Sequence, residues 1–143
     1  MPPGDFIYKS DFVVLHHCLD INIAGYFILS PIRHIESFGE LNYEELQDLA
    51  AILKLVTNVL TKEEDIDRVY ALSIGEETKH LHMHLFPRYN WMLKISHQYI
   101  YTNGKVDGGK LFSYVREKYQ VDKQDLFDSR LSLIVNAMRR ALS

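Results

Sequence analysis

Histidine and apolar residues alternate in the stretch His80-Leu81-His82-Met83-His84-Leu85-Phe86, which is followed by Pro87. Successive side chains of a β-strand point to opposite faces. A strand over residues 79–86 therefore places the three imidazoles on one face and the apolar side chains between them on the other. This alternation predicts a strand whose one face packs into a core and whose other face presents a row of histidines.

Further strands are expected on both sides of this one. Residues 5–15 are rich in aromatic and β-branched types, and the polar pair Ser10-Asp11 predicts a turn between two short strands. Residues 25–30 form an apolar run that Pro31 ends, which is typical of a central strand. One more strand is expected at 68–74.

A long amphipathic helix is expected at residues 42–60, where leucine, valine and alanine recur at spacings of three and four. Asn42 is the candidate N-cap, and Glu45 stands three residues later, as in a capping box. With 143 residues, 47% of them hydrophobic, and no internal repeat or linker, we expect a single domain over residues 1–143.

The carboxy-terminal part, residues 91–143, is expected to be a helical extension. Residues 103–109 are rich in glycine and predict a loop that moves or covers a site. A short helix is expected at 110–119, and Asp122 is the candidate N-cap of a second helix. One stripe of that second helix is apolar and is interpreted as core or dimer contact; it comprises Phe127, Leu131, Ile134, Met138 and Ala141.

Charge and cysteine content exclude several classes of partner and compartment. The net charge of −3 lacks the basic excess that binds phosphate backbones, so duplex nucleic acid is not an expected partner. Cys18 is the only cysteine, which excludes an intrachain disulfide and favours the reducing cytoplasm. Residues 1–5 do not begin a signal peptide, and no apolar run reaches the roughly 18 residues that span a bilayer, so no membrane association is expected.

Three interpretations of the histidine row compete. Imidazoles facing solvent are tolerated, but their mutual repulsion at low pH offers no packing gain. Imidazole also binds zinc and other transition metals, although strand rise separates the bases of the outer two side chains by about 13 Å. The third interpretation is chemistry on a phosphate, with the central histidine as nucleophile and its neighbours as hydrogen-bond donors. That nucleophile needs one unprotonated nitrogen, so its other nitrogen should donate to a fixed acceptor such as a backbone carbonyl.

The segment 80–86 resembles the signature of the histidine triad (HIT) family, His-φ-His-φ-His-φ-φ with φ apolar, and matches it without a gap. Residues 25–35 also resemble the family's apolar strand followed by proline, a basic residue and histidine. The resemblance covers about residues 6–90. It implies an α+β fold with a five-stranded antiparallel sheet and one long helix, paired into a homodimer. Dinucleoside polyphosphate hydrolases of the family also extend well beyond the triad, as this chain does.

By the same resemblance, the protein transfers or hydrolyses a nucleoside monophosphate that carries a substituted α-phosphate, either a dinucleoside polyphosphate or a nucleoside phosphoramidate. His82 is then the nucleophile that forms a nucleotidyl-histidine intermediate. His84 binds the α-phosphate and assists the leaving group, and His80 orients the nucleophile. No cofactor and no metal ion are expected.

The sequence departs from the family pattern near the triad. Gly25-Tyr26 stands where the family has Gly-His, so a phenol replaces an imidazole that supports the nucleophile. Glu77 stands where the family has a serine or threonine that donates to phosphate, and a carboxylate there opposes phosphate binding. A shift in register would let Thr78 serve instead, and Lys79 adds positive charge nearby.

Other positions are candidates for substrate binding. Cys18 stands where the family has the acidic residue that binds ribose, and Asp20 is the candidate replacement. His34 matches a family position but has an equally good interpretation as a structural histidine. His16 and His17 alternate across the sheet, so one is expected to line the site and the other to lie at the surface.

Our leading hypothesis is therefore a homodimeric hydrolase or transferase of the histidine triad type. The alternatives are a nucleotide-binding regulatory module with weak turnover and a metal-binding protein built on the histidine cluster.

Overall fold

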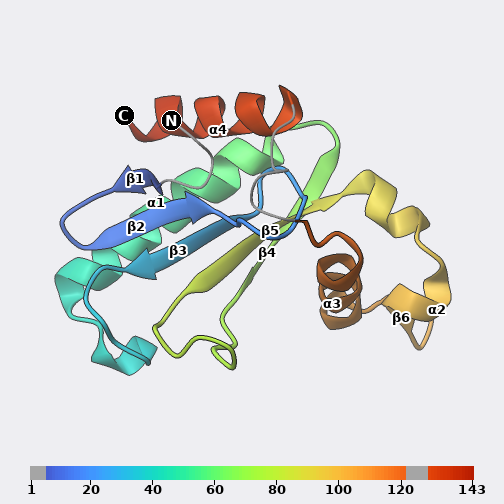
Figure 1. The fold of residues 1–143 in the computed structure, drawn as a ribbon, viewed down its shortest axis with the longest axis horizontal. Helices are drawn as coiled ribbons and strands as arrows, with labels where there is room; N and C mark the ends of the chain where they lie inside the picture. Colours follow the sequence, from blue (N-terminus) through green and yellow to red (C-terminus); the bar gives the residue numbers. More distant parts are fainter. Residues whose placement is uncertain (1–5, 122–128) are drawn as a thin grey trace.

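Five strands form one antiparallel sheet in the order β1-β2-β3-β5-β4, in a computed structural model that describes residues 6–121 and 129–143 (Figure 1). The expected α+β fold with a five-stranded sheet is confirmed. The third strand is central and buried along its whole length, as its apolar sequence predicts. The strands are β1 (Phe6–Lys9), β2 (Val13–His17), β3 (Phe27–Pro31), β4 (Ile66–Leu72) and β5 (Met83–Tyr89).

The histidine strand begins later than the sequence predicts. Only His84 of the three histidines lies within β5, and the strand continues past Pro87. Pairing of β5 with β3 reaches no further than Met83, opposite Leu29. Near this end β3 stops at Pro31, which has no N–H to extend a ladder. The prediction of a strand over 79–86 is therefore wrong at both ends, and the predicted strand at 68–74 likewise lies two residues earlier in the structure.

Helix α1 (Tyr43–Thr61) confirms the predicted amphipathic helix and its cap. The Asn42 side chain accepts from the Glu45 backbone N–H, while the Glu45 carboxylate accepts from that of Asn42, so the capping box is complete. This helix lies behind the sheet in Figure 1. Its buried apolar stripe joins the core and comprises Leu49, Ile52, Val56 and Leu60.

The carboxy-terminal extension leaves the sheet at the end of β5. Residues 103–109, expected as a loop over the site, instead form the turn of the small β6-β7 hairpin and the beginning of α3. They do not line the cavity that contains the triad. The elements are the 3-10 helix η2 (Asn90–Lys94), α2 (His97–Ile100), β6 (Tyr101–Thr102), β7 (Lys105–Val106), α3 (Gly108–Lys118) and α4 (Ser129–Leu142).

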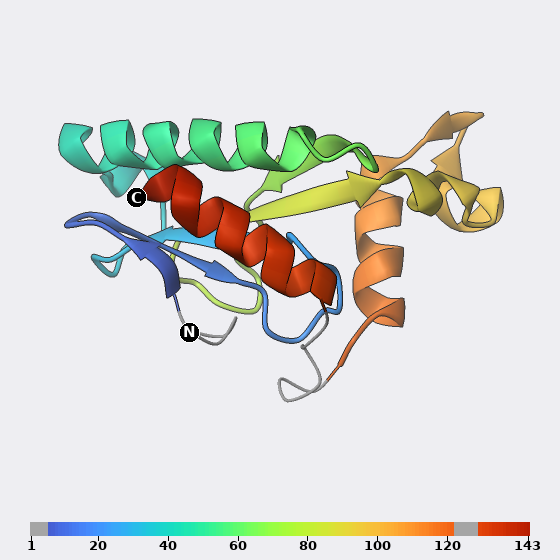
Figure 2. The ribbon, with the colours of Figure 1, turned by 90° about the horizontal axis from the view of Figure 1, so that it is seen from above.

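The last helix packs into the core of its own chain. Figure 2 shows α4 crossing close to α1, and the two helices are in contact, as are α4 and β1. Ala141 is exposed, while Asp122 and Phe127 lie outside the described residues. The buried members of the stripe are therefore core, as one of our two interpretations held. Its buried members are Leu131, Ile134, Val135 and Met138.

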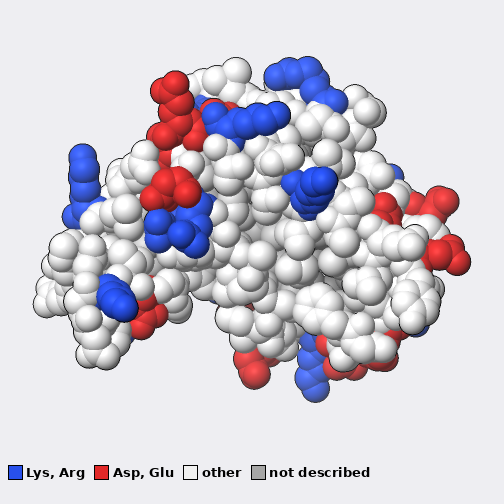
Figure 3. Space-filling model, turned by 180° about the vertical axis from the view of Figure 1, so that it is seen from behind, with Lys and Arg blue, Asp and Glu red and all other residues white. Residues whose placement is uncertain are grey.

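The face of the molecule on which α1 lies carries no concentration of charge of one sign (Figure 3). Figure 3 shows that side, with lysine and arginine side chains scattered among acidic ones, in agreement with a net charge of −3. In the described part of the chain, the helices are too short or too polar to cross a membrane.

Candidate active site

The triad opens into a cavity of about 400 Å³ on the sheet face opposite α1. Strand register builds its floor, because His16 on β2 lies opposite Ile28 on β3, which lies opposite His84 on β5. All three histidines of the triad border this cavity even though two of them precede the strand. The full lining is His16, Cys18, Leu19, Asp20, Ile28, Ser30, Thr78, His80, His82, His84 and Arg116.

His82 is held in the tautomer that a nucleophile needs. Its Nδ1 lies 2.8 Å from the backbone carbonyl oxygen of His80. A carbonyl only accepts, so Nδ1 carries the proton and Nε2 retains its lone pair. The chain bends at His80 and is irregular at residues 81–82, which agrees with the late beginning of β5. This is the fixed backbone acceptor that the sequence analysis expected for His82.

His80 is fixed against the neighbouring strand rather than against the His82 ring. Its Nε2 donates to the carbonyl oxygen of Pro31 at 3.0 Å, and its other ring nitrogen stays available. The ring of His34 lies beside it, with centroids 5.0 Å apart. His34 itself is exposed and does not line the cavity, so the structure favours its structural interpretation.

Tyr26 contacts His84 and not His82, which corrects the expectation that its phenol would lie next to the nucleophile. Its hydroxyl lies 2.5 Å from Nδ1 of His84. Burial raises the pKa of Tyr26, so the phenol remains a donor. Burial, followed by the charges of His82 and Arg116, lowers the pKa of His84 to about 4. His84 is thus neutral at pH 7, with Nδ1 accepting and the Nε2 proton facing the cavity.

The chain after β2 supplies the far wall of the cavity. The thiol of Cys18 donates to Asp20 Oδ1 at 3.2 Å, and burial raises the pKa of that thiol to about 12. His16 lines the cavity, as one of the two histidines was expected to do. His17 was assigned to the surface but is fully buried, which corrects that assignment. It donates to the Cys18 carbonyl oxygen and accepts from the Gly25 N–H, so it holds two loop segments together.

The segment before the triad is divided between neighbouring cavities. Thr78 lines the triad cavity, as the shifted register requires. Glu77 does not; it lines a smaller adjoining cavity of about 140 Å³. Lys79 lines a third cavity, which His82 also borders, and does not line the larger triad cavity. Thr78, the candidate replacement for the family donor, therefore lies where the triad can share a ligand with it.

Sequence analysis missed Arg116 and Phe112, which α3 brings to the triad. The Phe112 ring meets that of His84 edge-on at 5.6 Å, and Arg116 lines the cavity. The two residues are four apart and so share one helix face, which is a recognisable pattern. Nothing in the local sequence indicates that this face packs against the triad.

Metal ligation was the alternative use of the histidine row. Within the described ranges, histidine, cysteine and acidic side chains form no group of three or more that could hold a metal ion. His80, His82 and His84 each direct one ring nitrogen to a different protein group, which are the Pro31 carbonyl, the His80 carbonyl and the Tyr26 hydroxyl.

The fold and the cavity together define a histidine-triad protein of the α+β class. Residues 2–91 match the HIT domain family, and the chain belongs to this family. An uncharacterized HIT-like protein of Methanocaldococcus jannaschii is 30% identical over an alignment of 93 residues, and the match covers 61% of this chain and 70% of that protein.

Solved structures of histidine triad proteins share the fold. One from Bradyrhizobium japonicum matches with a TM-score of 0.66 at 15% identity, over 99% of this chain and 92% of that one. A Zn-bound histidine triad family protein from Mycobacterium smegmatis matches with a TM-score of 0.56 at 15% identity, over 96% of this chain and 82% of that one.

Proposed function

We propose that this protein is a nucleotide hydrolase or transferase that cleaves the bond between an α-phosphate and its substituent, through a nucleotidyl intermediate on His82. Membership of the HIT family supports a nucleotide-binding or hydrolase protein in general. The observation that carries the specific proposal is the hydrogen bond from His82 Nδ1 to the His80 carbonyl oxygen, which leaves Nε2 free to attack phosphorus.

The proposed reaction has two steps. In the first, Nε2 of His82 attacks the α-phosphorus, a phosphorus–nitrogen bond forms, and the bond to the leaving group breaks. In the second, water attacks the same phosphorus, the phosphorus–nitrogen bond breaks, and the nucleoside monophosphate leaves while the proton of the water passes to solvent. His84 donates its Nε2 proton in a hydrogen bond to a phosphate oxygen in both steps.

The state of His84 bears on the leaving group. A neutral imidazole donates a hydrogen bond but lacks the additional proton that an imidazolium would give to a departing amine. A nucleotide that leaves as a stable anion needs no such proton. A dinucleoside polyphosphate is therefore the substrate class that we place first, and a nucleoside phosphoramidate the second.

A nucleotide-binding regulatory module with weak turnover is the second candidate. It is favoured by one observation, that the phenol of Tyr26 supports His84 and leaves the His82 ring without the additional side-chain support that the family resemblance implies. Such a module would bind the same nucleotides without forming a covalent intermediate.

Release of nucleoside monophosphate from dinucleoside polyphosphates, phosphoramidates and nucleotide sugars tests the proposal. Wild-type protein should form an acid-labile nucleotidyl label after rapid quenching. His82→Asn should bind nucleotide but lose the label and lower turnover by orders of magnitude. His97→Asn removes an exposed imidazole outside the site and is the matched control. Nucleotide binding without any label on wild-type protein would establish the regulatory module instead.

We also propose one domain over residues 1–143, a homodimer and a cytoplasmic location. β4 ends the sheet, so its outer edge is available for pairing with a second copy. The free and buried Cys18 agrees with a reducing compartment. Sedimentation should give twice the monomer mass at micromolar concentration, and a monomer would contradict the paired sheet.

A further inference from the structure

Two cavities share both His82 and His84 in their lining. The larger holds His16 and Asp20, and the smaller, of about 140 Å³, holds Glu76, Glu77 and Phe112. A substrate that occupies both cavities must place its central atoms between them, within reach of the shared lining. The residues that line both cavities are Thr78, His82, His84 and Arg116.

Helix α3 holds Arg116 at this junction. The Phe112 ring packs edge-on against His84 and, at 5.2 Å, against Phe86. The Arg116 guanidinium carbon lies 5.4 Å from the centre of the Phe112 ring, so the aromatic side chain supports it. Phe112 therefore both packs α3 against β5 and lines the smaller cavity.

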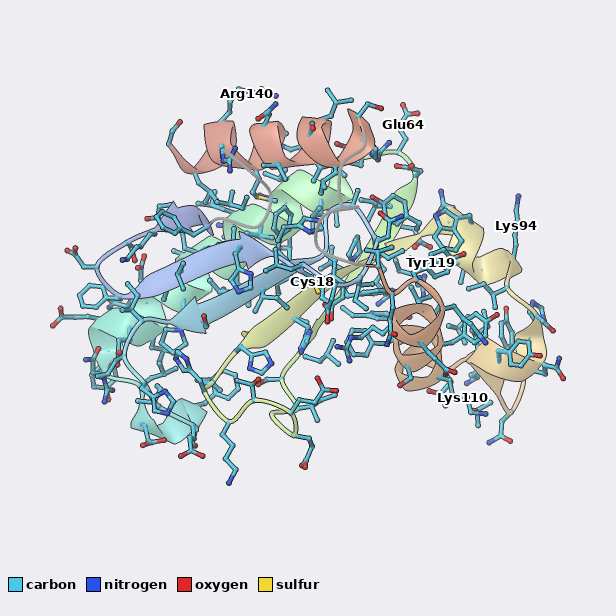
Figure 4. All side chains as sticks on the ribbon, viewed as in Figure 1. Cys18, Glu64, Lys94, Lys110, Tyr119 and Arg140 are labelled. Carbon is cyan, nitrogen blue, oxygen red and sulfur yellow. The ribbon has the colours of Figure 1, made fainter. Side chains whose placement is uncertain are left out.

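The end of α3 is fixed to the chain after β2. The Asn22 N–H donates to the carbonyl oxygen of Tyr119 at 2.7 Å, and the Val121 N–H donates to that of Asp20 at 3.0 Å. Figure 4 shows Tyr119 at this end of α3 and Lys110 at the other end. These backbone bonds attach α3 at the Tyr119 end and so position the turn of the helix that carries Arg116.

No described carboxylate forms an ion pair with Arg116. Its Nε is buried and has no hydrogen-bond partner among the described residues, where the ion pairs use Arg33, Arg88 and Arg130 instead. Asp20 lines the larger cavity with it, yet the two form no ion pair. A buried donor without a partner is uncommon in folded proteins, and this one belongs to a side chain that lines both cavities.

We infer that Arg116 binds the α-phosphate of the nucleotide, as a phosphate-binding residue that the carboxy-terminal extension supplies. The inference rests on the proposed function only in taking the bound phosphate to be that of a nucleotide. A guanidinium matches phosphate oxygens with two parallel N–H donors. It also offsets the negative charge of Glu76 and Glu77 in the smaller cavity. In the transition state, it stabilises the charge on the equatorial oxygens.

Calorimetric binding of a nucleoside and of its 5′-monophosphate tests this assignment without turnover. The probe is whichever of the four ribonucleoside 5′-monophosphates wild-type protein binds most tightly, compared with its parent nucleoside. Arg116→Gln should weaken monophosphate binding about ten-fold or more and leave nucleoside binding unchanged. Arg116→Lys should retain part of the preference for the monophosphate over the nucleoside, because lysine keeps the positive charge. Lys118→Gln, on the same helix but outside the cavities, should change neither affinity.

Each contrary result overturns the assignment. Equal weakening of nucleoside and monophosphate would show that Arg116 only shapes the cavity. Wild-type protein that does not prefer the monophosphate would remove the phosphate site. The test is independent of the proposed hydrolase activity. If monophosphate binding depends on Arg116 but no label forms on His82, the assignment of Arg116 holds and the hydrolase function is wrong.

Discussion

The hydroxyl of Tyr26 lies 2.5 Å from Nδ1 of His84, although 58 positions separate the two residues in the sequence. Tyr26 is fully buried, and its ring also packs edge-on against Phe86 at 5.3 Å. This contact sets which nitrogen of His84 carries the proton and so directs the Nε2 proton toward the cavity.

Tyr26→Phe removes that hydrogen bond and leaves the buried Nδ1 of His84 without its donor. We expect unfolding free energy to fall by about 1 kcal/mol and turnover to fall several-fold, because His84 loses its preferred tautomer. Urea unfolding and steady-state kinetics measure the two effects. Turnover equal to that of the wild type would show that the tautomer of His84 does not matter.

Stability should depend on the protonation of His84. Its folded-state pKa of about 4 lies below the ordinary value of 6.5, so between these values the unfolded chain binds a proton that the folded chain does not. Neutral His84 therefore contributes fully to the unfolding free energy above pH 6.5, and this contribution is lost as the pH falls toward 4. The loss is about 1 to 2 kcal/mol after allowance for partial exposure. His84→Gln should flatten this part of the urea-midpoint profile, and His97→Gln should not. A parallel profile for His84→Gln would assign the pH dependence to other groups.

Metal content separates the catalytic and metal-binding interpretations of the triad. We expect purified protein to carry no stoichiometric zinc and to keep its circular dichroism spectrum after prolonged chelation. Elemental analysis before and after chelation makes the measurement. If wild-type protein carries one equivalent of zinc per chain and His82→Asn does not, then His82 is a metal ligand and not the nucleophile.

Gly25 combines a left-handed backbone with a close approach to the core. Its φ is +91°, and a Cβ there would lie 3.0 Å from Leu60 Cδ2. Gly25→Ala should therefore cost about 2 to 4 kcal/mol of unfolding free energy, from backbone strain and overpacking together. Gly104→Ala is the matched control, because Gly104 has φ +76° but no atom within 4 Å. Equal losses in the two variants would show that Leu60 moves aside without cost.

Local sequence determined the elements that depend on neighbouring residues. Asn42 and Glu45 cap α1 because the capping box involves only residues three apart. The alternation of side chains at 80–86 predicted that His80, His82 and His84 share one face, and all three line one cavity. This holds although His80 and His82 precede the regular strand. The number of strands and their antiparallel order followed from the family resemblance and were confirmed.

Tertiary structure alone decided which distant residues share the site. Arg116 and His84 line one cavity because Phe112 of α3 packs against His84 of β5, a contact that no local pattern encodes. His17 is buried because its two ring nitrogens bond to backbone groups of Cys18 and Gly25, so its place in an alternating pattern did not predict its surroundings. Propensity and periodicity act over a few residues, whereas the charge, burial and hydrogen bonds of a cavity depend on segments that only the complete packing brings together.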